Sequence, residues 1–174
     1  ELIGAKGLDP ISMTDIAAKA GVALTAAYRY FPNKQAVVRE LALRSFESDE
    51  QMYAMFATRG DRSLRAWIED SVRTYCQAHR EDSRRLQIRA AVHADVELAD
   101  LNFEDSRNNA QAIAAALIDE GVDVPQAELE QRALLLLKLF DGAIDLARTV
   151  PPDESEAIIG RFAHLGGVLL LGDV

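Results

Sequence analysis

The chain has 174 residues, 49% hydrophobic and 27% charged, with a formal net charge of −9, which is ordinary for a soluble globular protein of one large domain or two small ones. Its one cysteine, Cys76, excludes an intramolecular disulfide framework and a cysteine-based zinc site, and it fits a reducing cytoplasm. No signal peptide is evident, and the apolar run over 168–171 is far too short to span a bilayer.

Residues 12–34 read SMTDIAAKAGVALTAAYRYFPNK and predict two short helices joined by a glycine turn. Ser12 is a suitable N-cap for the first helix, and Asp15 stands three residues later, as in a capping box. Gly21 is predicted to end this helix, because glycine enters the left-handed region without steric strain. Val22 is expected to be buried in the corner. The pattern therefore predicts a helix that stops at a tight turn.

A second short helix is predicted from Leu24 to Tyr30. Its Ala27 shares one face with Phe31, because residues four apart lie one above the other. Pro32 stops this helix, and Asn33 is placed to cap the next one, which opens at Lys34. Helix, glycine turn and helix together form the helix-turn-helix arrangement, whose second helix enters the major groove of DNA.

The remainder of the chain is predicted to be helical, with no strand alternation, repeat or low-complexity segment. Gly7 would cap the tail of an earlier helix, Gly121 is a predicted C-cap, and Asp153 is a predicted N-cap. Beyond the helix-turn-helix, helices are expected over 34–56, 63–80 and 83–92. A break is expected at 94–97, followed by a helix that ends at 120. Two more helices are expected, one over 126–148 and one that starts after 153.

The last two predicted helices are the most apolar. The helix over 126–148 is apolar on more than one face, so we expect it to be buried on two sides. Gly166 and Gly167 lie inside the final apolar helix, where they mark either a kink or a point of close packing.

Charge is distributed unevenly along the chain. Residues 1–45 hold six basic and four acidic side chains, a net of +2, so the remainder carries −11. A mildly basic N-terminal part suits contact with DNA phosphates. The acidic remainder is repelled by the phosphates, which disfavours non-specific contact between this part and DNA.

The run AKGLDPISMTDIAAKAGVALTAAYRYFPNKQAVV resembles the N-terminal domain of the tetracycline-repressor (TetR) family. The matching elements are Gly7, Thr14, Ile16-Ala17, Ala20-Gly21-Val22, Tyr28, Tyr30-Phe31-Pro32 and Lys34. The resemblance implies an all-α transcriptional regulator of about nine helices, most often a repressor, in the bacterial cytosol and on the nucleoid. A DNA-binding domain would cover 1–45 and a ligand-binding and dimerisation domain 46–174, and the chain would begin partway through the family's first helix.

Seven residues are candidates for contact with double-stranded operator DNA: Thr14, Leu24, Thr25, Ala26, Tyr28, Tyr30 and Lys34. Thr25 and Tyr28 would reach base edges or thymine methyl groups. Lys34 would hold a phosphate from a helix N-terminus. The alternative is that the two tyrosines only pack against the head.

The body offers candidates for a small-molecule pocket: Trp67, Tyr75, Arg89, His93, Phe103, Phe140 and Asp141. Ligand pockets are mostly apolar with a few fixed polar groups, which this set matches. The alternative for each residue is plain core or surface.

The family pairs its last two helices with those of a symmetry mate, which implies a homodimer. Candidate interface residues are Leu134, Leu137, Ile158, Phe162, Leu165 and Leu169. The alternative is an intramolecular core. Two-fold symmetry would place two recognition helices about 34–36 Å apart on a near-palindromic operator.

No glycine-rich phosphate loop, nucleophile elbow or paired-cysteine motif is present, so we expect neither an enzyme nor a bound cofactor. His79, His93 and His164 are too scattered to predict a metal site. The second hypothesis is a helical ligand-binding or protein-interaction module that no longer reads DNA.

Overall fold

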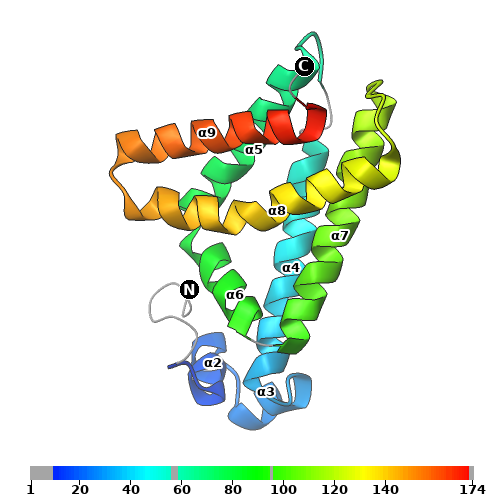
Figure 1. The fold of residues 1–174 in the computed structure, drawn as a ribbon. Coiled ribbons are helices and arrows are strands. Elements are labelled where there is room, and N and C mark those ends of the chain that lie inside the picture. Colours follow the sequence, from blue (N-terminus) through cyan, green and yellow to red (C-terminus); the bar gives the residue numbers. More distant parts are fainter. Residues whose placement is uncertain (1–9, 56–58, 95, 173–174) are drawn as a thin grey trace. The chain divides into compact units, whose positions relative to one another are not determined.

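The structure is a computed structural model and describes residues 10–55, 59–94 and 96–172. This part of the chain forms eight α-helices and no strand, so the all-α prediction is confirmed. The expected helix tail over 1–6 and its Gly7 cap lie outside the described residues. The helices in Figure 1 are α2 (Met13–Ala20), α3 (Leu24–Tyr30), α4 (Lys34–Met55), α5 (Leu64–Glu81), α6 (Ser83–Ala94), α7 (Val96–Asp119), α8 (Gln126–Thr149) and α9 (Pro152–Leu171).

The chain divides into two compact units. The first comprises Glu1–Asp49 and Asp82–Asn102, and the second comprises Glu50–Glu81 and Phe103–Val174. The first unit therefore holds α6 and the start of α7 together with α2 and α3. The second holds α5, α8 and α9 with most of α7.

Two small hydrophobic clusters stabilise the first unit. One is formed by Met13, Ala17 and Ala27, with Phe31 and Val37 packed against it. It joins α2 and α3 to the beginning of α4 and so fixes how α3 is held. The second cluster joins α4, α6 and α7 through buried Val38, Ala42, Val92 and Leu98.

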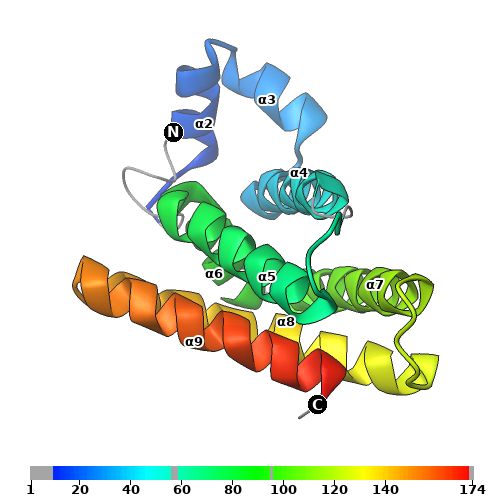
Figure 2. The ribbon, with the colours of Figure 1, turned by 90° about the horizontal axis from the view of Figure 1, so that it is seen from above.

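In the second unit, α9 packs along α8, and α5 packs against both (Figures 1 and 2). Gly166 lies at a close contact between α9 and its neighbours. A Cβ atom at Gly166 would lie 3.1 Å from Cγ2 of Val72 on α5 and 3.4 Å from Cδ2 of Leu136 on α8. Gly166 is therefore a point of close packing, the second of the two alternatives given by the sequence.

The start of α9 differs from the prediction. The helix begins at Pro152, with Pro151 as its N-cap and no side-chain cap hydrogen bond, so Asp153 lies inside the first turn. Proline suits this place because a first-turn amide has no partner within the helix. Asp153 still interacts favourably with the positive end of the helix dipole.

Within one chain, α8 is buried on one side, and the prediction of two buried sides is wrong for the single chain. Its buried stripe consists of Leu129, Ala133, Leu136, Phe140, Ile144 and Ala147. The outer stripe, which we define as Leu135, Leu139 and Leu146, is 50%, 45% and 52% exposed. Helices of the same chain cover the first stripe and leave the second open.

Candidate DNA-binding surface and ligand cavity

The helix-turn-helix begins with a complete capping box. The backbone amide of Asp15 donates to Oγ of Ser12 at 3.1 Å, and the amide of Ser12 donates to Oδ2 of Asp15 at 2.9 Å. At the other end, Gly21 adopts the left-handed conformation with φ 69°, and the amide of Val22 donates to the carbonyl of Ala17 at 3.0 Å. These bonds fix both ends of α2, as predicted from the sequence.

The capping of α3 and α4 differs. The N-cap of α3 is Ala23, which offers no side-chain oxygen to the first amides. Oδ1 of Asn33 accepts from the amide of Ala36 at 2.8 Å, so the predicted cap of the next helix is confirmed. Lys34 is therefore the first residue of a capped helix.

The α3 helix buries one face and exposes the other. Ala27 is 7% exposed and belongs to the cluster with Met13 and Ala17, whereas Leu24, Tyr28 and Tyr30 are 38%, 48% and 77% exposed. Of the other candidates, Thr14 and Thr25 are exposed, and Ala26 and Lys34 are partly buried. A side chain as exposed as Tyr30 does not pack into the head.

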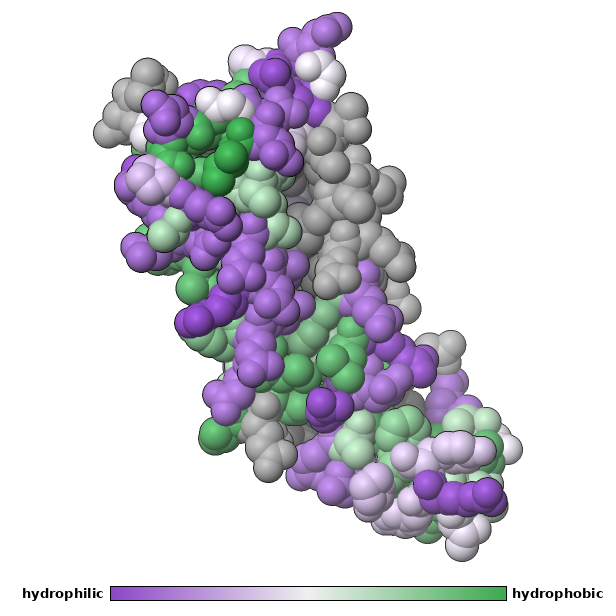
Figure 3. Space-filling view, turned by 90° about the vertical axis from the view of Figure 1, so that its right-hand side faces the viewer, coloured by the Kyte–Doolittle hydropathy of each residue, from purple (hydrophilic) through white to green (hydrophobic). Residues whose placement is uncertain are grey.

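The surface over α3, which is at the bottom of the view in Figures 1 and 3, is mostly pale in the hydropathy colouring (Figure 3). Alanine, threonine and tyrosine have intermediate hydropathy, which explains the colour. Val22, which the sequence placed in a buried corner, is 47% exposed. Its amide, rather than its side chain, stabilises the turn, so that prediction is wrong for the described structure.

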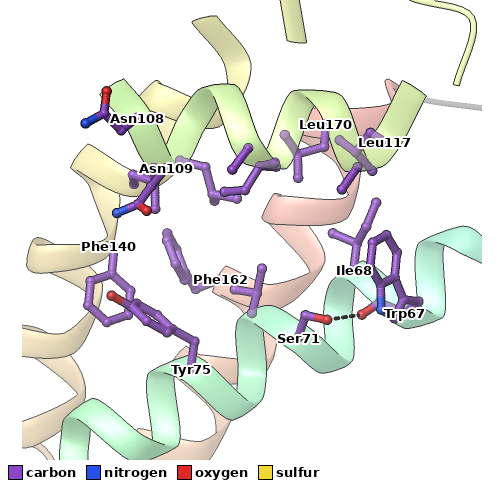
Figure 4. Close-up of a pocket in the computed structure, with 16 residues that line it drawn as sticks. Trp67, Ile68, Ser71, Tyr75, Asn108, Asn109, Leu117, Phe140, Phe162 and Leu170 are labelled. Carbon is purple, nitrogen blue, oxygen red and sulfur yellow. Dashed lines mark hydrogen bonds between the residues drawn. The ribbon is translucent and has the colours of Figure 1, made fainter. Parts of the chain in front are cut away.

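The second unit contains a cavity of about 450 Å³ between α5, α7, α8 and α9 (Figure 4). Ligand sites commonly have volumes of about 300–1,000 Å³. Its lining residues are Trp67, Ile68, Ser71, Val72, Tyr75, Asn108, Asn109, Ala112, Ile113, Ala116, Leu117, Leu136, Leu137, Phe140, Phe162 and Leu170.

Three predicted pocket residues, Trp67, Tyr75 and Phe140, line this cavity. Phe103 does not. It is 43% exposed, and its ring lies under Arg107 and Lys138, whose charged groups are 5.3 and 5.4 Å from the ring centroid. The helical repeat explains the difference, because Asn108, the first residue of α7 to line the cavity, lies five residues later and is turned about 140° around the helix axis from Phe103.

Asp141 also lies outside the lining, and the side chains of Arg89 and His93 lie outside the described part of the chain. The charged groups expected in the pocket are therefore not among its described lining residues. In their place the cavity has neutral polar groups from Ser71 and Asn109, which the sequence did not single out.

The polar groups of the cavity have defined partners. Oγ of Ser71 donates to the carbonyl of Trp67 at 2.7 Å, and Nδ2 of Asn109 donates to Oδ2 of Asp105 at 3.1 Å. The Tyr75 ring contacts the Phe140 ring, with centroids 4.7 Å apart. Figure 4 shows Tyr75, Phe140 and Asn109 toward one end of the cavity and Trp67 toward the other.

Family comparisons agree with this arrangement. Residues 1–41 match the model described as "Bacterial regulatory proteins, tetR family", and residues 62–163 match "Tetracyclin repressor-like, C-terminal domain". The second match covers more than half of the chain. The chain belongs to the TetR family. It is therefore a TetR-type, helix-turn-helix DNA-binding transcriptional regulator. A comparison with curated proteins finds no match.

The predicted dimer residues of this TetR-family chain fall into three environments. Leu137 and Phe162 line the cavity, so their side chains face inward. Leu134, Ile158 and Leu169 are partly buried, and Leu165 is 43% exposed. The outer stripe of α8 was not among the predicted dimer residues, although its spacing of four and seven residues is a helical repeat that the sequence already contains.

Two residues with reactive side chains, His79 and Cys76, are buried beside the aromatic residues of the cavity. His79 is 1% exposed; its Nδ1 lies 3.0 Å from the carbonyl oxygen of Tyr75, and its ring lies edge-on to Phe140. Burial raises the pKa of the Cys76 thiol to about 12, and neighbouring Arg73 lowers it by a smaller amount. At neutral pH Cys76 is therefore a thiol, not the nucleophilic thiolate.

The described residues contain no group of three or more histidine, cysteine, aspartate or glutamate side chains that could hold a metal ion. None of the described helices is both long enough and apolar enough to cross a membrane.

Proposed function

We propose that this TetR-family regulator binds a near-palindromic operator as a homodimer in the bacterial cytosol and represses transcription until a small molecule enters the cavity. Residues 1–45 would read DNA, and residues 46–174 would bind the effector and form the dimer. The observation that carries the proposal is the exposed face of α3. Its Tyr28 and Tyr30 are open to a partner, while Ala27 anchors the helix beneath them.

The chemistry of the α3 face supports contact with DNA. Thr25 and Tyr28 offer hydroxyl groups suited to base edges, and Leu24 offers an apolar surface for thymine methyl groups. Tyr30 and Lys34 suit phosphates, since Lys34 opens α4 at the positive end of the helix dipole.

The outer stripe of α8 supports the homodimer. Three leucines exposed on one side of a single helix form the kind of surface that proteins cover with a partner. Leu165 on α9 is also exposed, so a second copy of the same two helices would complete a four-helix arrangement.

The α8 helix offers a physical route for regulation. Its Leu136 and Phe140 line the cavity, whereas Leu135 and Leu139 belong to the outer stripe. A ligand that binds better to one arrangement of α8 shifts the dimer toward that arrangement and so changes the spacing of the two DNA-binding heads. The shift is limited by the ligand's differential affinity for the two states.

Operator binding by Lys34→Ala and Tyr30→Phe variants tests the proposal, using DNA from the promoter of the adjacent operon. We expect Lys34→Ala to weaken binding about tenfold and to lower the salt slope by about one per protomer, because one phosphate contact is lost. Tyr30→Phe should weaken binding about three- to tenfold through the loss of one hydrogen bond.

Arg62→Ala is the matched control, because it removes one positive charge from an exposed loop of the second unit. Dimerisation should be unchanged in all three variants. Equal operator affinity for Lys34→Ala and Arg62→Ala would reject α3 and α4 as the DNA-reading surface. Absence of any operator binding by the unmodified chain would instead favour the module that no longer reads DNA.

A further inference from the structure

The lining of the cavity is electrically neutral. Of its sixteen described lining residues, twelve are hydrophobic, and the polar members are Ser71, Tyr75, Asn108 and Asn109. We propose, on the basis of the effector role given above, that the ligand is an uncharged lipophilic molecule with a hydrogen-bond donor at one end. A medium-chain alcohol or a phenol has this chemistry.

An ionised ligand has no described counter-charge inside the cavity. The nearby cation Lys138 lies outside the lining, where its Nζ donates to Oγ of Ser106 at 2.7 Å and stands 5.4 Å from the centroid of the Phe103 ring. Transferring a carboxylate or ammonium group from water into apolar surroundings is strongly unfavourable without an opposite charge or several hydrogen bonds. The lining therefore disfavours both anionic and cationic ligands.

The hydrogen bonds already made inside the cavity favour a donor on the ligand. Ser71 has one hydroxyl hydrogen, and it is given to the carbonyl of Trp67, so its oxygen is left to accept. Asn109 uses one amide hydrogen on Asp105, and its carbonyl oxygen is an acceptor. A ligand hydroxyl would satisfy either oxygen.

Three of the four polar lining residues, Tyr75, Asn108 and Asn109, are separated from the apolar end of the cavity, whereas Ser71 lies beside Trp67 at that end (Figure 4). Asn109 and Tyr75 lie toward one end, and Ile68, Leu117 and Leu170 lie toward the other (Figure 4). A ligand with a hydroxyl head and a hydrocarbon body matches this separation. Asn109 and Tyr75 would then determine its orientation.

Displacement of a neutral fluorescent probe, N-phenyl-1-naphthylamine, from the full chain at pH 7 tests the charge preference. The competitors are 1-octanol, octanoate and octylamine, which share one chain and differ in head-group charge. We expect octanol to displace the probe at a concentration at least about tenfold lower than either ion, because only octanol enters without desolvating a charge. Equal displacement by octanoate or octylamine would overturn the inference, since the charged head would then be accommodated.

Two neighbouring alanines of α7 provide matched variants. Ala116 lines the cavity, whereas Ala115 is exposed and does not. Ala116→Phe should weaken probe binding by occupying part of the cavity, and Ala115→Phe should leave it unchanged. Equal binding by the two variants would place the probe elsewhere and reject the inference. If Ala116→Phe loses its helical circular dichroism, Ala112→Phe at the exposed edge of the lining replaces it.

Operator release, measured with the same three octyl compounds, separates this inference from the proposed function. Release by octanol alone supports both. Octanol-selective probe displacement without operator binding supports the neutral cavity and rejects the proposed function. Operator binding that only octanoate releases supports the proposed function and rejects the neutral ligand class.

Discussion

The α3 face and the outer stripe of α8 both expose apolar side chains, but their chemistry differs. On α3 the most exposed large hydrophobic residues are Tyr30 at 77% and Tyr28 at 48%, and each has a hydroxyl group. On α8 the exposed residues are leucines, at 45% to 52%. A tyrosine surface remains compatible with water and phosphates, whereas a leucine stripe is stabilised when another apolar surface covers it. The chemistry of the exposed side chains, more than their exposure, therefore separates the two surfaces.

The buried residues that hold each helix in place also differ between α3 and α8. The α3 helix has seven residues and is held mainly through Ala27, while α8 has 24 residues and a continuous buried stripe. A short helix held by a small residue relies on the capping of its neighbours for its orientation. A long helix with a buried face can present a second, apolar face without losing its structure.

The largest expected effect is on the leucine stripe. Leu139→Glu should convert a dimer to a monomer, raising the dissociation constant by at least about 100-fold, because each protomer would bury an unpaired carboxylate. Sedimentation velocity measures the change. Gln111→Glu is the control, since Gln111 is exposed on α7 and lies outside the stripe. A Leu139→Glu protein that remains dimeric would remove α8 from the interface.

A negative charge placed on α3 should weaken operator binding without affecting dimerisation. Tyr30→Glu is expected to weaken operator binding about 30-fold or more, because a carboxylate would face the phosphates, and to leave the dimer intact. Gln111→Glu makes an equal change of charge on the exposed side of α7 and serves as the control. Loss of the dimer in Tyr30→Glu would contradict the separation, as would operator binding equal to that of Gln111→Glu.

Local signals in the sequence predicted the helices closely. Ser12, Asp15, Gly21 and Asn33 occupy the caps expected of them, and α3 spans the predicted residues. These features depend on side chains within four residues of each other. The family resemblance of the head, read from the same short stretch, is confirmed by the family comparison.

Features that depend on packing between distant helices were predicted less well. Periodicity showed that α8 has two apolar sides, but not that its own chain covers only the side of Leu136 and Phe140. Aromatic content placed Phe103 in the pocket, although the turn of α7 carries it away from the lining. In each case the residue type indicated an apolar environment. The rotation of the helix about its axis in the folded unit determined whether that residue faced the core, the cavity or solvent.

The smallest predicted effect concerns the uncapped start of α3. Ala23 has φ −65° and ψ 144°, the extended conformation that an N-cap adopts, but alanine has no side-chain oxygen to accept from the first helical amides. Ala23→Ser should therefore stabilise the head by about 0.5–1 kcal/mol, because the serine hydroxyl accepts from an amide that has no partner within the helix. Amide hydrogen exchange within α3 measures the gain.

Ala18→Ser is the matched control for this prediction, because Ala18 is exposed inside α2, where serine has no free amide to accept from and a lower helix propensity than alanine. It should give no gain. The leucine stripe of α8 should not respond to either variant, so the dimer dissociation constant stays the same. If Ala23→Ser leaves exchange in α3 unchanged, the amides at its start already have partners, and the orientation of the α3 face is set by Ala27 and the flanking caps alone.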